Sequence, residues 1–87
     1  MHAVVVRVTL TDPGVAEAEV REQVVPRVSR QPGFVAGYWT RRHNTGLSMV
    51  LFESEEAAKD MSEMVRSVVP AGVTLEDVEV REVVAQA

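Results

Sequence analysis

Four segments of the chain are dense in β-branched and aromatic residues, and each is bounded by turn-forming residues. Residues 2–10 (HAVVVRVTL) form a valine-rich run about as long as a strand and shorter than most helices, which predicts a first β-strand. Residues 34–42 (FVAGYWTRR) and 47–53 (LSMVLFE) are separated by a short polar segment, which predicts an antiparallel hairpin. In residues 73–84, valines are separated by charged side chains, which predicts a final strand.

The turn of the hairpin, residues 43–46 (HNTG), contains residue types suited to left-handed backbone conformations. We expect Asn44 and Gly46 to take positive φ there, because asparagine and glycine tolerate that region best. The basic cluster beside the turn consists of Arg41, Arg42 and His43. It is expected to be a solvated tip, and a phosphate or carboxylate contact is the alternative.

Between the first two strands, apolar residues recur at roughly helical spacing. The helix is expected to begin after Thr11 or Asp12, since either can cap the free first-turn amides, with Pro13 in the first helical position. Its apolar stripe consists of Val15, Ala18, Val24, Val25 and Val28. Pro26 lies inside this stripe and removes one backbone hydrogen bond, which predicts a kink or a break.

A second amphipathic helix is predicted over residues 55–68. Ser54 supplies the N-cap, and Glu55 and Glu56 follow it, where the helix dipole favours carboxylates. The apolar residues recur at three- and four-residue steps and are Ala57, Ala58, Met61, Met64, Val65 and Val68. Pro70 and Gly72 end the helix.

The predicted order is β-α-β-β-α-β, which favours a single ferredoxin-like α+β domain over residues 1–87, with a four-stranded antiparallel sheet and both helices on one face. An apolar face of the first strand suits packing against helices and consists of Val4, Val6, Val8 and Leu10. The other face of the sheet still carries large apolar residues, which would be costly to leave in water in so small a chain. Two sheets facing each other across a twofold axis would cover them, so we expect a homodimer.

The hairpin and the helix start resemble a known superfamily. Residues 32–53 (PGFVAGYWTRRHNTGLSMVLFE) followed by residues 54–58 (SEEAA) are similar to the dimeric α/β-barrel superfamily, and within it to the antibiotic biosynthesis monooxygenase-like group. Strand order and length extend the similarity over essentially the whole chain. The resemblance implies a dimer whose two sheets close into a barrel, with a small-molecule cleft between sheet and helices or inside the barrel.

The resemblance also implies chemistry that this chain does not match residue by residue. Some members of the group oxidise polycyclic aromatic substrates without a cofactor, relatives degrade haem, and such members use an Asn, Trp and His constellation. Asn44 lies in the hairpin turn and not on the first strand, Trp39 comes earlier than the haem-degrading pattern requires, and His43 is at the turn. None of the three is therefore assigned a catalytic role, and the catalytic residues are unknown.

Three residues are candidates for binding a ligand: Arg7, Trp39 and Ser48. Arg7 interrupts a valine strand and would point into the space between two sheets, where it could bind an anion; the alternative is an ion pair across the dimer or strand, with Glu79 or Glu82 as partner. Trp39 could form the wall of a site for a flat aromatic ligand, or it could fill the core or the dimer interface.

Ser48 faces the same side as Val50 and Phe52, so it is either a hydroxyl in a pocket or a small packed residue. Tyr38 should face away from Trp39 on a regular strand, unless a bulge at Gly37 alters the alternation.

Composition excludes several classes of protein. The chain has no cysteine, which excludes disulfide scaffolds and thiolate metal sites, and no spacing of histidines and carboxylates predicts a metal ligand set. The net charge of −4 argues against nucleic-acid binding. No apolar run approaches the roughly 20 residues that a membrane helix needs, and no signal segment is recognised, so we expect a cytoplasmic protein without cofactors.

Two functional hypotheses remain. The first is a homodimer that binds a small apolar or aromatic molecule beside Arg7, Trp39 and Ser48, with cofactor-free oxygenation as the chemistry that the resemblance implies if the protein is an enzyme. The second is a non-catalytic dimeric module whose interface consumes the open sheet face, with Trp39, Met49 and Phe52 filling the space. A cavity that remains beside the candidate residues would favour the first.

Overall fold

The computed structural model describes residues 1–87 and contains one antiparallel sheet of four strands. The strands are β1 (His2–Leu10), β2 (Phe34–Arg42), β3 (Thr45–Phe52) and β4 (Val73–Glu82). Their order across the sheet is β2-β3-β1-β4, so β1 and β3 are central and β2 and β4 form the edges. The bounds of the first two strands are those predicted from their composition.

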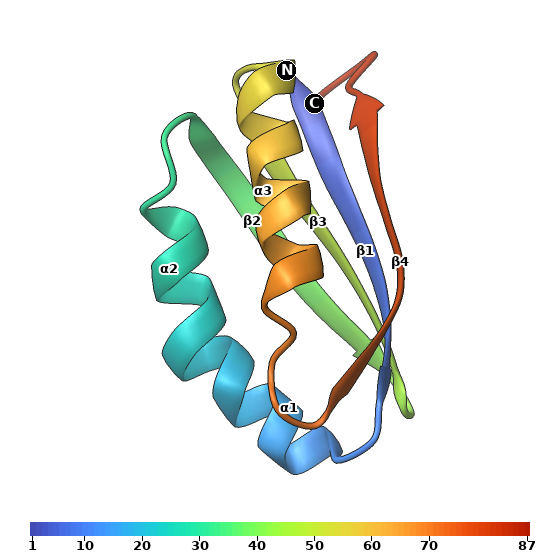
Figure 1. Cartoon of the computed structure of the whole chain (residues 1–87). Helices are drawn as coiled ribbons and strands as arrows, with labels where there is room; N and C mark the ends of the chain where they lie inside the picture. Colours follow the sequence, from blue (N-terminus) through green and yellow to red (C-terminus); the bar gives the residue numbers. More distant parts are fainter.

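The helices cover one face of this sheet (Figure 1). The helical elements are α1 (Pro13–Glu19), a π-helical turn η1 (Val20–Val24), α2 (Val25–Ser29) and α3 (Glu55–Ser67). The α1-η1-α2 stretch joins β1 to β2, and α3 joins β3 to β4. This arrangement confirms the predicted ferredoxin-like α+β fold.

The hydrophobic core lies between the sheet and the helices. Its buried members are Val4, Val6, Val28, Val50, Phe52, Ala58, Met61 and Val78. Val4 and Val6 belong to the apolar face of β1 that was predicted to pack on helices. Phe52 is fully buried and packs edge to face against Phe34, with the ring centroids 6.2 Å apart.

Side-chain caps fix where two helices begin. Asp12 is the N-cap of α1, because its carboxylate accepts a hydrogen bond from the Val15 backbone N–H at 3.2 Å. Ser54 caps α3, since its Oγ accepts from the Ala57 backbone N–H at 3.1 Å. Of the two candidates for the first cap, Asp12 and not Thr11 therefore fills the position, and the predicted cap of the second helix is confirmed.

The first helical stretch continues past the predicted break through a widened turn. The Val25 N–H donates to the Val20 carbonyl, five residues earlier, and Pro26 has no N–H to donate. The Arg21 carbonyl therefore accepts a hydrogen bond from neither Val25, which donates to Val20, nor Pro26. The irregularity caused by Pro26 is a π turn just before the proline, and α2 begins directly after it.

This π turn changes which residues face the sheet. The inward positions are Ala16, Val20, Val24 and Val28, each four residues after the last. In a regular α-helix, side chains four residues apart differ in direction by about 40°, which adds up to about 120° over these twelve residues. The wider π turn offsets this change of direction. The prediction that Val15 and Ala18 belong to the apolar stripe is wrong, because Val15 is 44% exposed and Ala18 is also exposed.

The hairpin turn also differs from the expectation. β2 ends at Arg42 and β3 begins at Thr45, so only two residues connect the strands. His43 takes the left-handed conformation (φ 55°), whereas neither Asn44 nor Gly46 has positive φ. The reason is that Gly46 is already paired in the sheet, opposite Val8, so the reversal falls at the first residue of the connection.

Gly72, in the segment after α3, is hydrogen-bonded to the residues just before α1. It has φ 77°, and its carbonyl accepts hydrogen bonds from the backbone N–H groups of Thr11 (2.9 Å) and Asp12 (3.3 Å). A Cβ at this position would lie 2.9 Å from the Asp12 carbonyl oxygen. The position therefore requires glycine both for its φ and for the close approach of the two backbones.

We expect Gly72→Ala to lower the free energy of unfolding by about 1–3 kcal/mol, because alanine is strained at positive φ and would push the two segments apart. Urea denaturation followed by circular dichroism measures the change. The matched control is Gly14→Ala, since a Cβ on Gly14 meets nothing closer than 3.8 Å. A loss of stability as large in the control as in Gly72→Ala would contradict the argument.

Candidate functional site

A cleft of about 710 Å³ lies between the helices and the sheet. The α1-η1-α2 stretch forms one wall, α3 and the segment after it form the other, and strands of the sheet form the floor. Figure 1 shows α2 and α3 side by side over the same face of the sheet. Hydrophobic side chains provide 19 of the 30 lining residues, so the cleft offers an apolar surface with a few polar groups, as small-molecule sites do.

Trp39 lines this cleft from the edge strand β2. Its indole ring lies back over Gly37: a Cβ on Gly37 would be 2.7 Å from the ring. The ring therefore lies close over the strand only because residue 37 has no side chain. Tyr38 points to the opposite face and is 63% exposed, which confirms the expected alternation of Tyr38 and Trp39. The irregularity in β2 lies between Phe34 and Ala36, and not at Gly37.

Ser48 lies beside Trp39 on the floor of the cleft. In the register of the sheet, Ser48 is opposite Trp39 on one side and Val6 on the other, and all three line the cleft. Its hydroxyl is a polar group within an otherwise apolar row. The structure therefore brings two of the three candidate residues, Trp39 and Ser48, together.

Arg7 lies on the other face of the sheet. It directly follows Val6, which faces the cleft, and side chains alternate along a strand. Arg7 is exposed and pairs in register with Leu47 and Asp77. Trp39 and Ser48 thus share the cleft without Arg7. The suggested partner Glu79 pairs instead with Arg81, at 2.9 Å.

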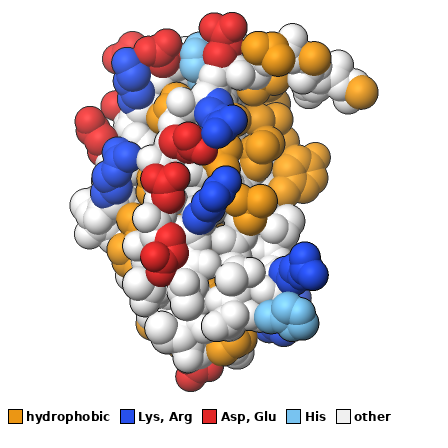
Figure 2. All heavy atoms as spheres, turned by 90° about the vertical axis from the view of Figure 1, so that its right-hand side faces the viewer, with side chains coloured by type: hydrophobic (Ala, Val, Ile, Leu, Met, Phe, Trp, Pro, Cys, Tyr) orange, Lys and Arg blue, Asp and Glu red, His pale blue; other side chains and the backbone are white.

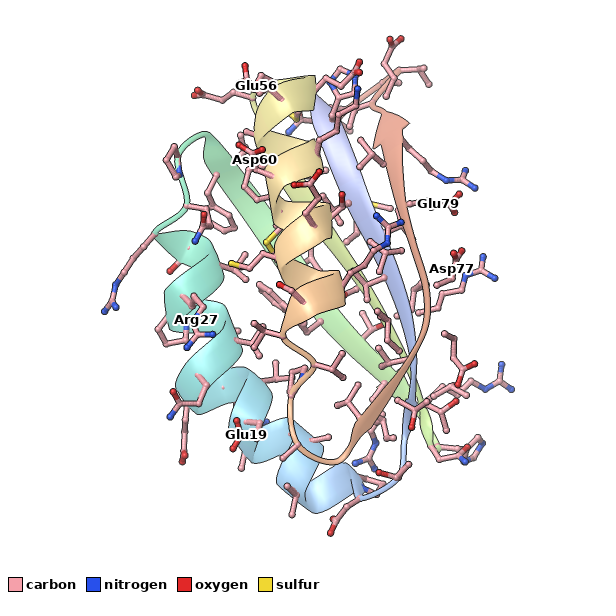
Figure 3. The ribbon with its side chains drawn as sticks, in the orientation of Figure 1. Glu19, Arg27, Glu56, Asp60, Asp77 and Glu79 are labelled. Carbon is pink, nitrogen blue, oxygen red and sulfur yellow. The ribbon has the colours of Figure 1, made fainter.

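The open face of the sheet is divided into an apolar and a charged part. The apolar part lies on β2 and β3, where Tyr38, Leu47 and Met49 are 63%, 48% and 45% exposed. Asp77 and Glu79 on β4 point away from the helices (Figure 3). Figure 2 shows hydrophobic side chains gathered beside a group of charged ones on this side of the molecule.

Two ion pairs lie near the start of α1, and one of them joins the helix to the sheet that forms the floor of the cleft. The Glu17 carboxylate lies 3.2 Å from Arg21 on η1 and 3.6 Å from Arg41 on β2. The basic cluster at the hairpin is exposed, as expected, and Arg41 also contacts a carboxylate of the chain, which links the edge strand to the helix. The side chains are about half exposed or more, so the pairs contribute little stability. They place charged groups around one end of an apolar cleft.

The ionisable groups with shifted pKa lie outside the cleft. At the exposed start of α3, the Lys59 ammonium donates a hydrogen bond to the Glu55 carboxylate, with 2.7 Å between Nζ and Oε1. This hydrogen bond, with the charges of Lys59 and His2, lowers the pKa of Glu55 below its ordinary value, and it raises the pKa of Lys59. The pair lies at a solvated helix end and takes no part in the cleft.

No group of three or more His, Asp or Glu side chains is arranged to hold a metal ion. None of the helices has the length and apolar character needed to span a membrane. No protein-family model matches the sequence, and a search of curated proteins finds no match. The fold and the cleft are therefore the observations from which a function can be argued.

Proposed function

We propose that the protein binds a small apolar or aromatic molecule in the cleft between its helices and its sheet, and that it acts as a homodimer of the dimeric α/β-barrel superfamily. The observation that carries the binding proposal is the cleft itself, with Trp39 and Ser48 on its floor. Its lining is predominantly apolar, and transfer of an apolar ligand from water into it is favourable. The indole adds a large flat surface and an N–H donor.

The proposed dimer would pair the open sheet faces of two copies. Exposed Tyr38, Leu47 and Met49 support this pairing, because together they form an apolar patch that a partner would remove from water. A twofold axis places the same patch on both subunits, so the patch must be complementary to itself. A second copy would leave most of the cleft accessible, since Trp39 and Ser48 face the helices while Tyr38 and Met49 face the other side of the sheet. We further propose a cytoplasmic location.

Binding, and not catalysis, is the part of the proposal that the geometry supports best. The resemblance to the antibiotic biosynthesis monooxygenase-like group implies cofactor-free oxygenation, but the lining of the cleft contains neither histidine nor asparagine. Glu17 and Glu19 are its carboxylates, and Glu17 is held by two arginines. We therefore assign no catalytic residue.

Titration with 1,4-naphthoquinone tests the binding proposal, because Trp39 is the only tryptophan and lines the cleft. We expect saturable quenching of its fluorescence. Ser48→Leu, which fills the floor of the cleft, should weaken the apparent affinity at least about tenfold, equivalent to the loss of roughly 1.4 kcal/mol of binding free energy. Ser29→Leu, on the exposed side of α2, is the matched control and should leave the affinity unchanged.

Two results would overturn the binding proposal: the absence of saturable quenching across a panel of quinones and polycyclic aromatic compounds, or equal quenching in the wild type and Ser48→Leu. The second candidate function, a non-catalytic dimeric module, is favoured by the apolar patch around Met49 on the open face. A protein that is dimeric in solution, yet binds no member of the panel, would support that candidate.

A further inference from the structure

The polar side chains of the cleft carry an uneven charge. Three arginines and two glutamates line it, which gives the lining a formal charge of +1, whereas the whole chain has a net charge of −4. These residues are Glu17, Glu19, Arg21, Arg27 and Arg41. A positive cleft in an acidic protein favours a ligand with a negative charge, because the field at the site opposes that of the remaining surface.

One arginine of the cleft has no partner in the chain. Arg21 and Arg41 share the single carboxylate of Glu17. Arg27, in contrast, takes part in none of the five ion pairs of the structure. Its guanidinium therefore keeps its hydrogen-bond donors available to a ligand.

The position of Arg27 gives it a second polar neighbour and an apolar opposite wall. Gln23 precedes it by four residues, about one helical turn, and also lines the cleft. One turn further along, Gln31 Nε2 lies 3.7 Å from Met64 Sδ, so this end of α2 comes close to α3. The guanidinium of Arg27, the amide of Gln23 and apolar residues of α3 therefore line the same opening of the cleft.

We propose that the cleft binds a hydrophobic monocarboxylate, with the carboxylate held by Arg27 and Gln23 and the apolar body lying against Trp39. The inference rests on the proposed binding function and assigns its ligand class. A planar guanidinium matches a carboxylate through two parallel N–H donors, which a neutral ligand cannot use.

The distribution of charge along the cleft sets the orientation of such a ligand. Glu19 also lines the cleft, but it comes eight residues before Arg27, roughly 12 Å along a helix axis. Figure 3 shows the two labelled side chains at different levels of the α1-η1-α2 stretch. Glu17, Arg21 and Arg41 lie at the same end as Glu19, so the charges there cancel, and only the Arg27 end keeps a positive charge. The charged group of the ligand therefore lies toward the end of α2.

Decanoic acid and decanamide are the probes, because they share the alkyl chain and differ in charge at neutral pH. We expect both to shift the emission of Trp39, and the acid to bind about fivefold more tightly, as an exposed ion pair allows. In Arg27→Gln the ratio of the two dissociation constants should fall toward one. The preference of the wild type for the acid should also shrink between 20 mM and 500 mM NaCl, where screening is stronger.

Arg30→Gln is the matched control, since Arg30 is an exposed arginine at the end of α2 that does not line the cleft. It should retain the preference for the acid. Equal affinity of the wild type for acid and amide, or an unchanged preference in Arg27→Gln, would overturn the assignment of the ligand class while the binding function stands. Binding of neither probe, with no response to aromatic compounds, would overturn the binding function itself.

Discussion

Replacing Phe52 with alanine is expected to lower the free energy of unfolding by about 3–5 kcal/mol. Phe52 is fully buried at the end of β3 and contacts Phe34 edge to face. The truncation removes the transfer free energy of the ring and leaves a cavity that the surrounding strands and α3 cannot close, because interiors are tightly packed. A domain of this size has a total stability of only about 5–15 kcal/mol, so the substitution removes a large fraction of it.

Urea denaturation monitored by circular dichroism measures this loss, and Phe52→Leu covers the case in which Phe52→Ala does not fold. Leucine keeps most of the buried volume, so that variant should lose roughly 1–2 kcal/mol. Val84→Ala, at a site after β4 that is 88% exposed, is the control and should stay within about 0.5 kcal/mol of the wild type. A loss below about 1.5 kcal/mol in Phe52→Ala would contradict the position of Phe52 in the core.

Met49→Asp is expected to dissociate the proposed dimer. Met49 lies near the middle of the apolar patch on the open face, flanked in register by Tyr38 and Val5. In a twofold interface each substitution occurs twice, so two carboxylates would have to leave water. At about 2 kcal/mol or more for each charge, the dissociation constant should rise at least about a thousandfold.

Sedimentation velocity over a dilution series measures this change, with circular dichroism showing that the separated subunits remain folded. Ala18→Asp introduces the same charge at an exposed site on α1 and should leave the dimer intact. A wild type that is monomeric at micromolar concentration would refute the proposed dimer. A dimer equally tight in Met49→Asp would show that the subunits associate through another surface.

The strands could be predicted from the sequence because a strand has the shortest repeat of any element. Every second residue faces the same side, so nine residues such as His2–Leu10 already specify which side chains face the helices. The same rule separates Tyr38 from Trp39. Applied to Arg7, it indicated that this residue faces away from the helical layer, and the structure agrees.

The π turn and the cleft could not be predicted in the same way. Pro26 signals an irregular helix, but whether the backbone breaks, kinks or widens depends on which register turns Val20, Val24 and Val28 toward the sheet. The cleft depends on how far α2 stands from α3, which is a property of tertiary packing. Gln23 and Arg27 were missed for this reason, since in sequence they look like ordinary solvated positions between inward-facing valines.

The contact between Trp39 and Gly37 makes a residue without a side chain a determinant of ligand size. The indole ring occupies the space that a Cβ on Gly37 would fill. Its distance from β2 therefore sets how much room is left for a ligand above the ring. Natural variation at position 37 would consequently tune the thickness of the molecules admitted, without altering any group that touches them.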